Sequence, residues 1–203
     1  MLKRMSTRMS VAALVCSLGA CVDAGKSFDD FGDRVGTTDA NTVDRPPSSI
    51  FNITGSFLVS VHAGFETAND PAYYMQMLVN WTLIDGDTAT LDGSYIPLCT
   101  FQSCAPMREM IPPAITNVAP VATDGTFSQP IVGTLPSGAN PLSGSQQPMN
   151  GLLNATILDA DTVCGSVTGT VAGLDLAGST FAAIRVTDTA AANLPPPVAN
   201  CPN

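Results

Sequence analysis

The chain has 203 residues, 45% of them hydrophobic, and a formal net charge of −9 at pH 7. This hydrophobic content argues against a disordered chain. The acidity excludes nucleic acid as a partner, because phosphate binding needs a basic surface. Beyond residue 50, Arg108 and Arg185 are the only lysine or arginine residues.

The first 20 residues have the layout of a secretory signal peptide. Lys3, Arg4 and Arg8 give a positive start, and an apolar run over residues 11–18 follows. This run is far shorter than the ~18 residues that a membrane-spanning helix requires. We therefore expect export of the chain and no membrane span in this segment.

Residues 18–21, Leu-Gly-Ala-Cys, resemble the lipobox of bacterial lipoproteins. In that motif a branched aliphatic residue and two small residues precede the cysteine that becomes diacylated. The resemblance implies a signal peptide over residues 1–20, cleavage before Cys21 and lipid on Cys21. Because two acyl chains anchor a protein stably, we expect a lipoprotein of the cell envelope, held on a membrane through its lipid, with the outer membrane as its location.

Residues 21–50 are expected to form a flexible tether after the lipidated cysteine. Apolar residues are few and show no sustained period, and glycine and proline recur, which is typical of a linker. The alternative is an N-terminal arm that packs on the domain through Phe28 and Phe31.

Alternating apolar and polar residues from position 50 onward are typical of half-buried strands. The alternation covers residues 53–61 and 74–84, and Asp85-Gly86-Asp87 before residues 88–98 indicates a hairpin. Asp70-Pro71 is typical of a helix start, but the aromatic and β-branched residues after it favour a strand.

Nine of the 16 prolines lie between Pro97 and Pro148, so no long helix fits there. Short strands are expected over residues 115–121 and 126–135, followed by clearer alternation over 152–158, 164–171 and 180–186. Seven or eight short strands without a long helix predict an all-β fold. We expect one domain over residues 51–203, either an antiparallel β-sandwich or a small β-barrel.

Four cysteines remain after the lipidated Cys21, namely Cys99, Cys104, Cys164 and Cys201. An even number in an oxidising compartment indicates two disulfides. Of three pairings, Cys99–Cys104 and Cys164–Cys201 are favoured, because the first closes a small loop and the second ties the tail to a strand. A metal site is not expected, since no short Cys-x-x-Cys or histidine spacing occurs.

His62 is the single histidine and the one candidate for acid–base or nucleophilic catalysis, with Glu66 four residues later. Its place in an alternating strand favours a structural or exposed histidine instead.

Aspartate pairs give two candidate calcium loops, Asp85 and Asp87 with Asp92, and Asp159 with Asp161. Neither has the spacing of an EF-hand, so turn aspartates are the favoured interpretation. We therefore predict no catalytic residue, metal or cofactor.

The leading hypothesis is a lipid-anchored envelope β domain with a non-enzymatic binding, adhesion or structural role. Its partners would be the membrane, through the lipid anchor, and a protein or glycan. One alternative is a small-molecule carrier with an apolar cavity inside a barrel. Another is a glycan hydrolase built from two carboxylates about 5 to 10 Å apart.

Overall fold

The computed structural model describes residues 50–86 and 88–202. The expected signal peptide, Cys21 and all of the expected tether up to residue 49 lie outside these residues. In the described part of the chain, no helix is long and apolar enough to cross a membrane.

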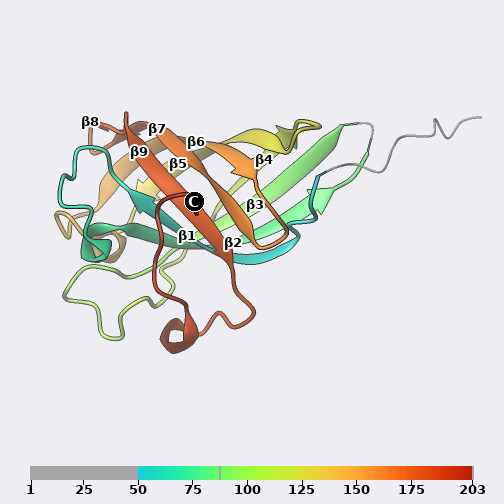
Figure 1. The fold of residues 1–203 in the computed structure, drawn as a ribbon. Coiled ribbons are helices and arrows are strands. Elements are labelled where there is room, and N and C mark those ends of the chain that lie inside the picture. Colours follow the sequence, from blue (N-terminus) through green and yellow to red (C-terminus); the bar gives the residue numbers. More distant parts are fainter. Residues whose placement is uncertain (1–49, 87, 203) are drawn as a thin grey trace, which may run out of the picture. The chain divides into compact units, whose positions relative to one another are not determined.

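The described chain forms a small antiparallel β-barrel (Figure 1). Eight strands follow the order β6-β5-β4-β3-β2-β1-β9-β7, pairing of β6 with β7 closes the barrel, and the short β8 adds to β7. The all-β prediction is confirmed, and of its two architectures the barrel is the one formed. The strands are β1 Gly55–His62, β2 Met75–Ile84, β3 Ala89–Pro97, β4 Ile115–Val121, β5 Thr126–Leu135, β6 Gln147–Ile157, β7 Thr162–Val171, β8 Leu174–Asp175 and β9 Ser179–Arg185.

Short 3-10 turns occupy two of the connections, η1 Pro71–Tyr73 and η2 Ser137–Ala139, and a third, η3 Ala191–Asn193, follows β9. The helix signal at Asp70 produces η1, because the Asp70 side chain accepts a hydrogen bond from the amide of Ala72. The chain then leaves this turn directly into β2, so the strand expected over residues 74–84 also forms.

Aromatic side chains fill the middle of the barrel. Phe57, Trp81, Tyr95 and Phe181 are each at most 1% exposed. The rings of Phe57 and Trp81 lie 4.9 Å apart, and Phe127 meets Trp81 edge-on at 6.0 Å. Alternation along each strand directs these residues to one side, which becomes the interior when the sheet closes.

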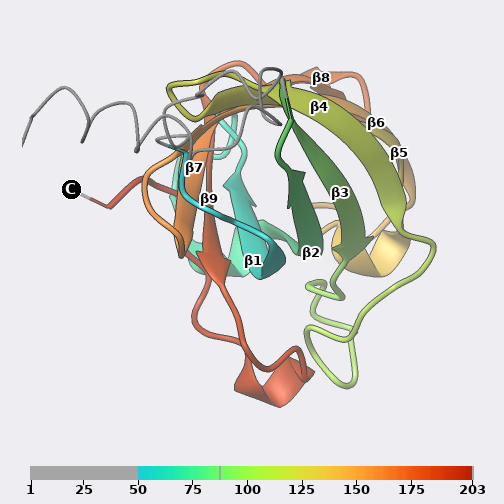
Figure 2. The same cartoon turned by 90° about the vertical axis from the view of Figure 1, so that its right-hand side faces the viewer.

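A second apolar cluster explains why Leu58 interrupts the alternation of β1. Leu58 has the opposite parity to the inward-facing Phe57, so it points away from the barrel interior. It packs there in a buried cluster that includes Leu78 and Leu194. The C-terminal segment, which lies at the same end of the barrel as the loop between β3 and β4, thus covers part of the outer wall (Figure 2).

The structure contains the two disulfides that the cysteine spacing favoured. Cys99 is bonded to Cys104 and Cys164 to Cys201, with Cα–Cα separations of 5.8 and 5.4 Å. Both separations are ordinary for a disulfide. The second bond ties the tail of the chain to β7.

β6 begins five residues earlier than the alternation indicated. Pro148 and Gly151 interrupt the sequence pattern, yet both pair with residues of β5. Cross-strand pairing outweighs the local propensity here, because β6 lies between β5 and β7 and is paired on both edges.

Candidate functional site

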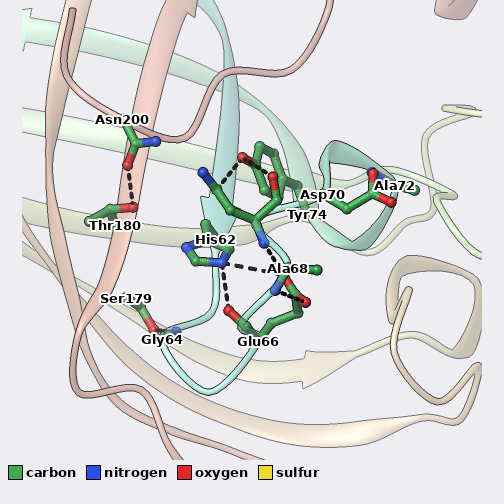
Figure 3. Close-up of polar contacts among 11 residues, drawn as sticks. His62, Gly64, Glu66, Ala68, Asp70, Ala72, Tyr74, Ser179, Thr180 and Asn200 are labelled. Carbon is green, nitrogen blue, oxygen red and sulfur yellow. Dashed lines mark hydrogen bonds and ion pairs between the residues drawn. The ribbon is translucent and has the colours of Figure 1, made fainter. Parts of the chain in front are cut away.

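His62 lies at the end of β1, where its ring faces the loop that follows (Figure 3). Its Nε2 is 2.8 Å from the carbonyl oxygen of Glu66 and 3.3 Å from the Oε2 atom of the same residue. The imidazole also lies 5.7 Å from the ring of Tyr74. The structure therefore brings the predicted His62–Glu66 pair together.

The Glu66 carboxylate is engaged within its own loop. Oε1 accepts a hydrogen bond from the amide of Ala68, and Oε2 accepts one from the amide of Asn69. The Tyr74 hydroxyl donates to the Asn69 side chain. Burial, followed by the negative charges of Glu66 and Asp70, raises the pKa of Tyr74. These contacts hold the loop between β1 and η1 together, and they direct the Glu66 carboxylate to backbone amides of that loop.

The hydroxyl groups of β9 near His62 are also engaged. Ser179 is fully buried, and its Oγ accepts a hydrogen bond from the amide of Gly64. Thr180, which pairs with His62 across the sheet, donates to the side chain of Asn200. This arrangement supports a structural role for His62, since the groups around it hold the backbone together.

The first candidate calcium loop is only partly described, since Asp87 lies outside the described residues. Asp85 accepts a hydrogen bond from the amide of Gly86, and Asp92 is exposed on β3. Among the described residues, no group of three or more His, Cys, Asp or Glu side chains is placed to hold a metal ion.

The second candidate calcium loop forms a turn that Arg185 fastens to the barrel. Asp159 accepts a hydrogen bond from the amide of Asp161, which is the geometry of an Asx-turn. The Arg185 guanidinium pairs with Asp161 at 2.7 Å and lies 4.6 Å from the centre of the Phe57 ring. These aspartates organise a turn, as the sequence interpretation has it.

A buried glutamine completes the barrel interior. Gln129 is fully buried, and its Oε1 accepts hydrogen bonds from Trp81 Nε1 and the Tyr95 hydroxyl. Its Nε2 donates to the carbonyl oxygens of Asn117 and Leu91. Burial raises the pKa of Tyr95. The polar groups at this level of the barrel thus satisfy one another.

The wall of the barrel opens between β4 and β5. β4 pairs with β3 along all seven of its residues and β5 with β6 along all ten, but β4 and β5 pair only at Val121 and Phe127. The next two positions of the ladder would require amide hydrogens from residue 120 of β4 and residue 130 of β5, and both are prolines. Pro120 and Pro130 therefore end the ladder, and the two strands form a seam.

A surface groove of about 580 Å³ lies at the wider end of this seam. Its lining carries no charged side chain, and it includes Val132, which is 56% exposed. The lining includes Pro112, Pro113, Ile115, Val132, Thr134 and Pro136.

Sequence reasoning missed this groove because it treated the prolines between residues 97 and 148 only as helix breakers. The usable signal was one proline inside each of the two predicted strands, Pro120 and Pro130, since a strand proline marks a free edge. The fold and the groove define a small closed β-barrel with aromatic residues buried in its interior and a seam between β4 and β5. Comparison with protein-family models, curated proteins and solved structures finds no match to this chain.

Proposed function

We propose that the chain is a lipid-anchored domain of the bacterial cell envelope that binds a partner on the outer wall of its barrel, without catalysis. The observation that carries the binding role is an uncharged groove in the wall of a barrel whose interior is filled. The position of Glu66 within its own loop supports a non-catalytic role for His62.

Anchoring rests on the lipobox resemblance of residues 18–21. Three of the eight basic residues of the chain, and none of its 17 acidic ones, lie in the first 20 residues. Cleavage would therefore leave a chain more acidic than the whole, and anionic headgroups would repel it, so the acyl chains would have to supply the attachment. Cys21→Ala should abolish incorporation of labelled palmitate. Undiminished labelling and detergent partitioning of this variant would contradict the anchor.

The experiment that tests the binding role places a photo-crosslinking residue at position 132 of the full-length lipoprotein in intact cells. Val132 lines the groove, whereas Leu174, which is 52% exposed on β8, does not line it and provides the matched control. We expect a discrete adduct from position 132 and none from 174. Equal adducts from both positions, or none from 132, would argue against a binding function of this wall.

The carrier alternative is tested through Trp81, the one tryptophan of the chain, which lies in the filled interior. A ligand taken up inside the barrel would contact its indole ring. We expect a fluorescent fatty acid to leave the Trp81 emission unchanged at saturating concentration. Stoichiometric quenching would favour the carrier over a binding role on the wall.

A further inference from the structure

We propose that the seam between β4 and β5 receives an extended, uncharged peptide segment of a protein partner, which adds as a strand to the free edge of β5. This inference rests on the proposed binding function and specifies its partner. It follows from the direction of backbone groups along β5, from the chemistry of the groove and from the residues that border it.

The direction of the backbone groups follows from two hydrogen bonds at the start of β5. The carbonyl of Thr126 accepts from Ala122 on the β4 side, and that of Gly125 accepts from Ile157 on the β6 side. Alternate residues of a strand direct their amide and carbonyl groups to the same edge. Even-numbered residues of β5 therefore face β4.

Val132 and Thr134 consequently direct their amide and carbonyl groups into the seam. The ladder between β4 and β5 has already ended at Phe127, so within the described residues no strand pairs with them on that edge. Val132 and Thr134 lie two positions apart, and each has a backbone amide and carbonyl without a strand partner on this edge. An extended peptide can pair with such groups by adding as a strand. A lipid tail would leave these polar groups without partners at a cost in free energy.

The side chains around this edge favour an uncharged segment. The groove is lined without any acidic or basic residue, and Ile115 and Val132 offer apolar contacts on its two sides. Its volume lies within the range of ordinary binding pockets. A charged segment would lose hydration there without gaining a partner.

Prolines limit what can occupy the seam. Pro112, Pro113 and Pro136 border the groove, and Pro120 and Pro130 stop the ladder at the closed end of the seam. Such residues keep an exposed edge from pairing indefinitely with other sheets. The free edge is thus short, which suits a single peptide segment of a few residues.

The experiment selects peptides from a phage-displayed library of random heptapeptides on the full-length lipoprotein in detergent. Each selected peptide is then synthesised in two forms, N-methylated at odd or at even residues. Strand addition uses one set of amides only, so one form should bind at least about tenfold more weakly and the other should bind normally. Binding should also slow the hydrogen exchange of the Val132 and Thr134 amides.

Three variants locate the site. Val132→Glu should weaken peptide binding at least about tenfold, while Leu174→Glu should not change it. Pro120→Val combined with Pro130→Val restores both missing amides, so the ladder should extend, the seam should close and binding should fall although the fold persists.

Failure to enrich any peptide over the Val132→Glu protein would overturn the proposal, as would equal effects of both N-methylated forms. Photo-crosslinks from position 132 to a glycan would then leave the binding role intact and exclude only the peptide.

Discussion

The Gln129 side chain of β5 donates a hydrogen bond from Nε2 to the main-chain carbonyl of Asn117 in β4, at 2.9 Å. It links the two strands beside Pro120 and Pro130, which lack the amide hydrogens that the ladder would need. A side chain from the interior thus joins β4 and β5 where backbone hydrogen bonds between them are missing. The barrel stays closed on its inner side while the outer edge of β5 remains free.

Removal of this contact should destabilise the barrel strongly. Gln129→Leu would leave the Trp81 indole, the Tyr95 hydroxyl and the Asn117 carbonyl without their buried partner. We expect a loss of about 3 kcal/mol in the free energy of unfolding, measured with urea. Ser128→Ala, on the exposed face of the same strand, should cost about 0.5 kcal/mol. Similar losses in both variants would contradict the role of Gln129.

The Tyr95 hydroxyl should stay protonated in the folded protein at alkaline pH. Burial raises its pKa in the folded state above the unfolded value of about 10. The stability that this shift contributes is therefore present below the unfolded pKa and is lost as the pH rises through the folded pKa. Alkaline titrations of wild type and Tyr95→Phe, followed by tyrosinate absorbance, should coincide until unfolding begins. An earlier difference would show that Tyr95 is accessible.

His62→Gln should leave both the fold and the envelope phenotype largely intact. The pair with Glu66 is partly exposed, so we expect a change in the free energy of unfolding of about 1 kcal/mol or less. Glu66→Ala should cost about 2 kcal/mol, because two loop amides lose their acceptor. If His62→Gln keeps the melting temperature but reproduces the phenotype of a deletion strain, the non-catalytic proposal is wrong.

The bond between Cys164 and Cys201 should contribute substantially to stability. It joins residues 37 positions apart and so restricts the unfolded chain. Replacement of both cysteines by serine should cost about 3 kcal/mol. Mass spectrometry without reductant should find no free thiol among the four cysteines of the two disulfides. Alkylation of Cys164 in the native oxidised protein would contradict this pairing.

Gly165 of β7 should not tolerate a side chain. A Cβ atom there would overlap the main-chain carbonyl oxygen of Asn154 in β6. Gly165→Ala should therefore cost about 2 kcal/mol, since backbone has to shift. Gly151→Ala in β6 is the matched control, because its nearest neighbour would lie at an ordinary 3.7 Å. Thermal unfolding of the two variants should separate them clearly.

The sequence alone determined where most strands lie, because side-chain alternation is a local property of the chain. The predicted strands over residues 115–121 and 126–135 coincide with β4 and β5. The cysteine spacing likewise singled out the two pairs that the structure joins. Each of these features depends on residue types and on distances along the chain.

Only the tertiary structure decided between a sandwich and a barrel, because that choice depends on the pairing of β6 with β7 and of β1 with β9. It also turned Leu58 outward onto the C-terminal segment and Gln129 inward to Trp81. The seam forms because the edge of β5 that lacks an amide hydrogen faces β4. The sequence does not say which strand that edge will face, because this is decided only when β4 and β6 pack beside β5. Alternation cannot specify a neighbour, since every strand of period two can in principle pair with any other.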